Sequence, residues 1–113
     1  IANIGDSRAY AIINNELNQL TKDDSIVWHY YEQGKLSKDE LRFHIQKNLI
    51  TKCIGHTYNI KPSILKINNN NYSALILLTD GVTDCLSDDR IKFIINKKGI
   101  THFWIMPFYY IAS

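Results

Sequence analysis

The sequence predicts an α+β protein in which antiparallel strands are combined with short helices. Over the first 20 positions, short β-branched and aromatic stretches alternate with turn residues, a pattern typical of consecutive antiparallel strands. Capping residues precede helix-like stretches near positions 25, 37 and 87. A strongly apolar run at 72–78 has the length of one buried strand and ends at an Asp-Gly pair. Strands and helices thus come in separate groups, as in α+β folds.

The opening strands are expected to form a β-meander at 1–4, 8–13 and 16–20. Gly5-Asp6-Ser7 has the composition of the first turn, and Asn14-Asn15 that of the second. Both turns are short enough to join neighbouring antiparallel strands.

Further strands are expected in the second half of the chain. Residues 49–54 are apolar and β-branched enough to be extended, and 60–67 alternates once Pro62 is placed near its start. The asparagine-rich loop 68–71 favours a turn. We therefore expect 60–67 and 72–78 to pair as a hairpin.

The middle of the chain is expected to form a helical hairpin. The first helix begins after Asp24 or Ser25 and ends at Gly34, a plausible residue for the left-handed position after a helix. Ser37 and Glu40 have the spacing of a capping box, which predicts a second short helix. The residues expected along one face of that helix are Leu41, His44 and Ile45.

The last helix is expected to begin at Ser87. Two aspartates lie in its first turn, where the helix dipole favours negative charge, and two lysines precede Gly99, where it favours positive charge.

Length and composition limit the kinds of function. The 113 residues suffice for one small domain, and a net charge of +2 provides no basic stripe for a nucleic acid. Cys53 and Cys85 are far apart and in no metal-binding spacing, so both are expected to be reduced. No signal-peptide pattern opens the chain, and the apolar tract 100–112 is too short to span a bilayer. We expect a cytoplasmic protein with no nucleic-acid or membrane partner.

Aspartates cluster where two predicted strands end. Asp80 follows the strand 72–78, with Gly81 allowing the backbone to turn away, and Asp84 comes four residues later. Asp6 lies in another turn at a strand end. If the turns are neighbours, their carboxylates repel each other unless a cation lies between them, and Mg²⁺ or Mn²⁺ prefers such oxygen ligands.

A simpler interpretation remains open at this point. Asp-Gly pairs are common in turns without any ligand, and acidic residues often only cap the helix that follows. The EF-hand pattern fails after Asp80, and the sequence contains no P-loop, no nucleophile elbow and no zinc-protease motif.

Four blocks of sequence resemble one enzyme family in order and spacing. They are IANIGDSRAY at 1–10, LTKDDS at 20–25, NLITKCIG at 48–55 and LTDGVTD at 78–84. Over residues 1–96 the chain resembles the carboxy-terminal part of the metal-dependent type 2C protein serine/threonine phosphatases, in their compact bacterial form. The resemblance implies a partial four-layer αββα sandwich with antiparallel sheets, in which residues 26–48 form a flap beside the active site.

The resemblance also implies chemistry. In this family a binuclear Mg²⁺ or Mn²⁺ centre activates a water that attacks phosphoserine or phosphothreonine. Asp80 matches a ligand of that centre, and Asp6 and Asp84 match ligands of a further, weaker metal. His44 and Asn48 resemble flap-end positions, although His44 is also explained as a helix-face histidine. The implied partners are phosphoproteins and a cognate protein kinase.

The chain departs from the family at both ends. The amino-terminal motifs with the phosphate-binding arginine and several metal ligands are missing, as is the last Asp-Asn motif, and 99–113 is an atypical tail. Residues 1–113 are therefore expected to be a single incomplete phosphatase domain that is inactive alone, with no catalytic residue of its own assigned. The alternative is a noncatalytic remnant or protein-binding module that retains the sheet.

Overall fold

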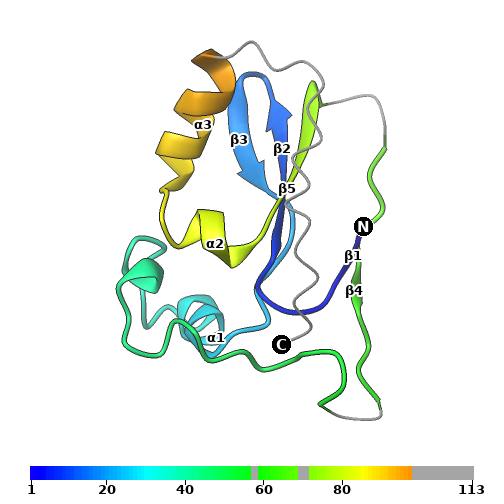
Figure 1. The fold of residues 1–113 in the computed structure, drawn as a ribbon, viewed down its shortest axis with the longest axis vertical. Helices are drawn as coiled ribbons and strands as arrows, with labels where there is room; N and C mark the ends of the chain where they lie inside the picture. Colours follow the sequence, from blue (N-terminus) through cyan, green and yellow to red (C-terminus); the bar gives the residue numbers. More distant parts are fainter. Residues whose placement is uncertain (57–58, 69–71, 98–113) are drawn as a thin grey trace.

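A computed structural model describes residues 1–56, 59–68 and 72–97 of the chain. The atypical tail at 99–113 and most of the asparagine-rich loop lie outside these residues. Figure 1 shows a sheet with a long helix beside it and shorter helices gathered at one end. The elements are β1 (Ala2–Asn3), β2 (Arg8–Ile13), β3 (Glu16–Gln19), α1 (Ile26–Glu32), the 3₁₀ helix η1 (Glu40–Arg42), β4 (Ser63–Ile64), β5 (Ala74–Leu78), α2 (Asp80–Thr83) and α3 (Asp88–Lys97).

The main sheet has three antiparallel strands in the order β3-β2-β5. The predicted strands 8–13 and 16–20 form the β2–β3 hairpin. Its turn residues Asn14 and Asn15 have φ angles of 51° and 63°, the left-handed values that tight hairpin turns require and that asparagine tolerates. The sequence signal at this turn is confirmed.

Two of the predicted strand pairings are wrong. β1 does not continue the meander but pairs with β4 in a separate two-stranded sheet, and β5 pairs with β2 instead of with 60–67. Gly5, at φ 100°, turns the chain out of the main sheet before β2 begins. β5 has the apolar residues that fit beside the buried strand β2, whereas β4 is exposed. Burial, not sequence proximity, therefore selects the partner strand.

The predicted extended stretch at 49–54 is largely irregular. Only Ile50 joins the strand network, through an isolated bridge to Ser25. Ile50 and Ile54 are 40% and 80% exposed, so the apolar residues of this stretch do not mark a buried strand.

The helical hairpin forms, but its second helix is only one 3₁₀ turn. Ser25 caps α1 by accepting a hydrogen bond from the Trp28 amide at 3.2 Å, and Gly34 has the expected positive φ of 70°. In the capping box, the Ser37 amide donates to Glu40 Oε2 at 2.7 Å. The predicted apolar face is wrong at Ile45, which is 96% exposed, because η1 ends at Arg42.

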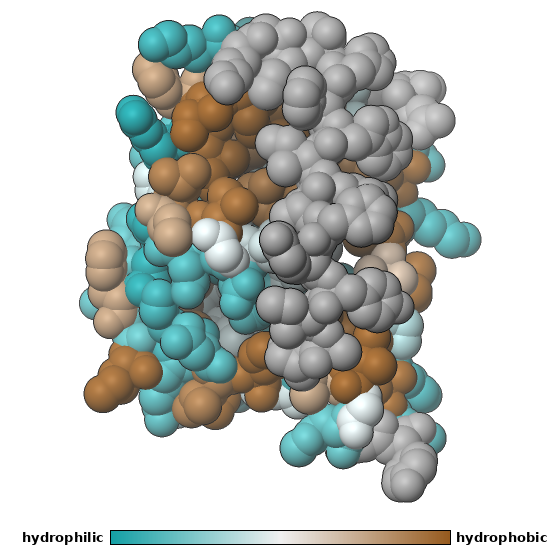
Figure 2. All heavy atoms as spheres, in the orientation of Figure 1, coloured by the Kyte–Doolittle hydropathy of each residue, from teal (hydrophilic) through white to brown (hydrophobic). Residues whose placement is uncertain are grey.

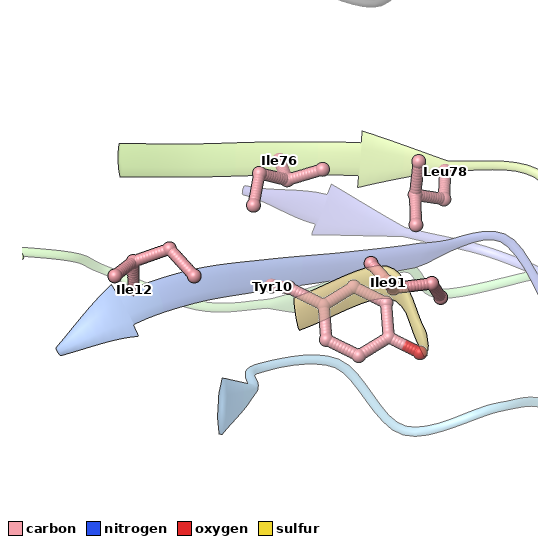
Figure 3. Packing of buried hydrophobic residues seen from close by; sticks show 5 residues of the cluster. All are labelled: Tyr10, Ile12, Ile76, Leu78 and Ile91. Atoms are coloured by element: carbon pink, nitrogen blue, oxygen red, sulfur yellow. The ribbon is translucent and has the colours of Figure 1, made fainter. Parts of the chain in front are cut away.

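α3 begins at the position expected after Ser87 and packs against the sheet. Figure 3 shows the buried cluster that joins β2, β5 and α3, formed by Tyr10, Ile12, Ile76, Leu78 and Ile91. A second cluster of Val27, Trp28 and Leu41 fixes α1 to η1. Within the described ranges, no helix is long and apolar enough to cross a membrane.

We expect Ile91→Ala to lower the free energy of unfolding by about 2–5 kcal/mol, because it leaves a cavity between α3 and the sheet. Ile91 is 4% exposed. Phe93→Ala on the same helix is the control, since Phe93 is 51% exposed and its removal opens no cavity. Urea unfolding followed by circular dichroism measures both variants. Equal losses for the two would contradict the packing described here.

Candidate metal site

The register of the main sheet brings the two aspartate turns to the same end of the molecule. Arg8 of β2 lies opposite Leu78 of β5 in the antiparallel ladder. Asp6 comes two residues before Arg8, and Asp80 comes two residues after Leu78. Because the strands are antiparallel, the start of β2 and the end of β5 lie side by side, so both aspartates lie just beyond the same end of the ladder.

Asp6, Asp80 and Asp84 all line one small cavity of about 30 Å³. We call it the acidic pocket. The short helix α2 brings the last two together, because the Asp84 amide donates to the Asp80 carbonyl at 2.7 Å. The other residues of the pocket are Arg8, Asp23, Val27, Leu41, Arg42, Lys47 and Thr83. Figure 2 shows hydrophilic side chains gathered over α2 and the chain beside it, and hydrophobic ones over the sheet and α3.

The other carboxylates of the pocket are close enough to change the ionisation of Asp6. Partial burial raises the pKa of Asp6 above its ordinary value, and the negative charges of Asp80, Asp23 and Asp84 raise it further. Crowded carboxylates of this kind are stabilised by a divalent cation, which prefers oxygen ligands. The chemistry of the donors therefore fits Mg²⁺ or Mn²⁺.

The described residues provide only part of a coordination shell. Among them, no group of three or more His, Cys, Asp or Glu side chains is arranged to hold a metal ion. Asp84 is instead paired with Lys47, whose Nζ lies 3.0 Å from Asp84 Oδ2. The assignment of Asp6, Asp80 and Asp84 as metal ligands stays a prediction.

Arg8 forms a largely buried ion pair with Asp23. Arg8 Nη2 lies 2.6 Å from Asp23 Oδ2, and Nε donates to both carboxylate oxygens. The two side chains are only 13% and 7% exposed. The guanidinium also donates to the Tyr10 hydroxyl, and burial raises the pKa of Tyr10 to about 12. Tyr10 thus remains a hydrogen-bond donor to Asp88, which ties β2 to α3.

Three residues of the acidic pocket were missed by sequence reasoning. Asp23 lies inside the block LTKDDS at 20–25, which carries part of the family resemblance, so this block could have marked it as a candidate site residue. Arg42 ends η1 and Lys47 lies in the irregular stretch that follows it in the flap segment, residues 26–48, and only the tertiary fold brings them to the pocket.

The flap-end residues do not line the acidic pocket. His44 accepts a hydrogen bond from the Gln46 amide at 3.1 Å and packs against the Tyr30 ring, which supports a local structural role. Asn48 is exposed. Cys53 and Cys85 are free thiols, as expected, and Cys85 is exposed directly after Asp84.

We expect Asp6→Asn to stabilise the metal-free chain at neutral pH. A raised pKa in the folded state means that ionisation of Asp6 weakens folding, so wild-type stability falls as the pH rises through that pKa. The advantage of the variant should vanish below pH of about 3.9, where the carboxyl is protonated in both states.

Urea unfolding at several pH values in chelator-treated buffer measures this difference. Asp39→Asn is the control, because Asp39 is exposed and does not line the acidic pocket. If the wild-type chain were more stable than Asp6→Asn at pH 7, ionised Asp6 would not be destabilised by burial and by the neighbouring carboxylates, and the prediction would be refuted.

Comparison with known proteins shows the same fold and related sequences. The protein phosphatase PhpP of Streptococcus pneumoniae is 37% identical over 96 residues, which cover 85% of this chain and 39% of PhpP. The crystal structure of the serine/threonine phosphatase Stp1 from Staphylococcus aureus matches with a TM-score of 0.79 and 38% identity, over 83% of this chain and 37% of that one.

A third match carries metal ions. The catalytic domain of the serine/threonine protein phosphatase PstP, in complex with two manganese ions, matches with a TM-score of 0.62 and 27% identity, over 84% of this chain and 38% of that one. No family model matches the chain. The chain spans about two fifths of the length of the curated relatives. By sequence identity and by fold, it therefore belongs to the family of bacterial type 2C serine/threonine phosphatases, of which it represents a part.

Proposed function

We propose that this chain is the carboxy-terminal part of a metal-dependent protein serine/threonine phosphatase and that residues 1–113 are a single incomplete domain of that enzyme. The observation that carries the proposal is the register of β2 and β5, which brings Asp6 and Asp80 to one pocket in a chain related to Stp1. A sheet that only stabilised the fold would not need two crowded carboxylates at its edge.

Asp6, Asp80 and Asp84 are the proposed metal ligands, and Mg²⁺ or Mn²⁺ is the proposed cofactor. The two manganese ions of the related PstP structure support this choice. When bound, such ions lower the pKa of a coordinated water and stabilise charge on a phosphoryl oxygen. The residues of this chain contribute carboxylate oxygens, and the Arg8–Asp23 pair holds the β2 end of the pocket in place.

The proposed substrates are proteins that carry phosphoserine or phosphothreonine. The names of the relatives, which are serine/threonine and protein phosphatases, support this class. A cognate protein kinase in the cytoplasm would supply such substrates. Val27, Leu41, Arg42 and Lys47 of the flap segment 26–48 line the acidic pocket, which supports a role of this segment in substrate access.

We expect the chain alone to bind Mn²⁺ weakly and to hydrolyse no p-nitrophenyl phosphate, because the described residues supply only part of a coordination shell. Mn²⁺ binding is measured by loss of the free-ion electron paramagnetic resonance signal. Asp80→Asn should abolish it, whereas Asp89→Asn, outside the acidic pocket, should leave it unchanged. Mn²⁺-dependent hydrolysis by the chain alone would overturn the expectation of inactivity.

We expect residues 1–96 to restore activity when they replace the matching segment of PhpP. The chimera should remove phosphate from a phosphoserine peptide in the presence of Mn²⁺, and Asp80→Asn should lower its rate by at least about 100-fold, because a metal ligand is lost. A folded chimera that binds Mn²⁺ but shows no turnover would refute the proposed function.

A noncatalytic protein-binding module is the second candidate. The observation that favours it is the lack, within the described ranges, of a complete group of metal-binding side chains. The chimera separates the two candidates, because a module that has lost the chemistry cannot restore turnover to PhpP.

A further inference from the structure

A second cavity lies beside the acidic pocket. It has a volume of about 160 Å³, several times that of the acidic pocket at about 30 Å³. Its walls are the 38–42 stretch of the flap segment and the 87–89 stretch at the start of α3. Arg8, Leu41 and Arg42 line both cavities, so the two adjoin at these residues.

Arg42 differs from the other cations of the acidic pocket in its pairing. Arg8 is bonded to Asp23, and Lys47 is bonded to Asp84. No ion pair joins Arg42 to a carboxylate in the described part of the chain. Its Nη2 reaches only the Asp84 carbonyl, at 3.4 Å, and its Nε is buried without an acceptor.

An unpartnered buried guanidinium donor is costly, because it has lost water and gained no acceptor. The backbone that carries Arg42 is nevertheless anchored. Leu41, the preceding residue, is 4% exposed and packs with Val27 and Trp28. Arg42 itself lines both cavities, and its guanidinium lies 5.7 Å from the centre of the exposed Phe43 ring. A planar fork of N–H donors in such a place suits the oxygens of a phosphoryl group.

The acidic residues of the larger cavity do not oppose this role. Asp88 already pairs with Lys38 at 2.8 Å and accepts a hydrogen bond from Tyr10. Asp39 and Asp89 are exposed, where water and salt screen their charges. The charge of Arg42 thus faces the cavity without a neutralising partner among the described residues.

We propose that Arg42 binds the phosphoryl group of the substrate in the larger cavity, next to the acidic pocket. This inference rests on the proposed phosphatase function and adds a substrate-binding residue to it. The fork of Arg42 supplies the N–H donors, and Leu41 supplies an apolar wall for the rest of the phosphorylated side chain.

The test is a nuclear magnetic resonance titration of the full chain in chelator-treated buffer. The probes are N-acetyl-phosphoserine amide and inorganic phosphate, and N-acetyl-serine amide at equal ionic strength is the blank. We expect both phosphorylated probes to shift the Arg42 Nε–H signal in a saturable way, with the tighter binding for the phosphoserine compound because it also contacts Leu41. A signal that does not move, or that moves equally with the blank, would overturn the proposal.

Variants separate a binding role from a structural one. Arg42→Gln should weaken binding of N-acetyl-phosphoserine amide by about tenfold or more, because a charge-assisted hydrogen bond is lost. Arg42→Lys should weaken it less, since it keeps the charge but loses the fork. Arg90→Gln is the matched control, because Arg90 lies over the Phe93 ring and lines neither cavity.

Weak Mn²⁺ binding, measured separately, distinguishes this inference from the proposed function. Arg42→Gln should leave Mn²⁺ binding unchanged, whereas Asp80→Asn should lose it and keep the Arg42 signal shift. If Arg42→Gln fails to fold, Arg42→Lys decides the result. The role assigned to Arg42 would be overturned if the folded Arg42 variant bound N-acetyl-phosphoserine amide as tightly as the wild type. It would also be overturned if Arg42→Gln lost Mn²⁺ binding as well.

Discussion

The pairing of β2 with β5 is the constraint on which the site depends. Five consecutive pairs, from Arg8 opposite Leu78 to Ile12 opposite Ala74, fix the two strands in one register. The same register buries Tyr10, Ile76 and Leu78 against α3 (Figure 3). A slip by one residue would turn those side chains to the other face of the sheet and separate Asp6 from Asp80. The core and the acidic pocket therefore depend on the same hydrogen bonds.

Electrostatic contacts hold the flap segment against this end of the sheet. Lys38 pairs with Asp88, Lys47 pairs with Asp84, and Arg42 donates to the Asp84 carbonyl. All three cations come from the part of the flap segment that follows α1, and their acceptors, Asp84 and Asp88, lie between the end of α2 and the first turn of α3. These contacts are exposed and weak individually, so salt screens them. The buried cluster around Leu41 is the stronger attachment.

The sequence correctly predicted those elements in which a turn or cap residue stands next to an apolar pattern of the matching period. The Asn14-Asn15 turn, the Ser25 cap and the helix after Ser87 each combine a turn or cap residue with a matching apolar pattern, and all three are present. Pairing partners were not predictable in the same way. The 60–67 stretch alternates like a strand, but only Ser63–Ile64 is extended, and it pairs with β1, far away in the sequence.

The candidate site shows the same limit. Asp6, Asp80 and Asp84 were recognisable because each follows a strand or a short turn with a family-like pattern, and the fold brings them to one pocket. Arg42 and Lys47 carry no local signal, because the path of η1 and of the irregular chain after it decides whether they reach the pocket. Ile45 is an example. Helical spacing predicted that its side chain would be buried, but η1 ends at Arg42 and Ile45 is exposed.

The exposed thiol of Cys85 allows spectroscopy to test whether the acidic pocket binds a metal ion. Cys85 directly follows Asp84, and Cys53 is the only other cysteine of the chain. With Cys53 replaced by serine, a nitroxide attached at Cys85 would lie next to the acidic pocket. Paramagnetic broadening of that label by Mn²⁺ would then report occupancy of the pocket directly, without any turnover.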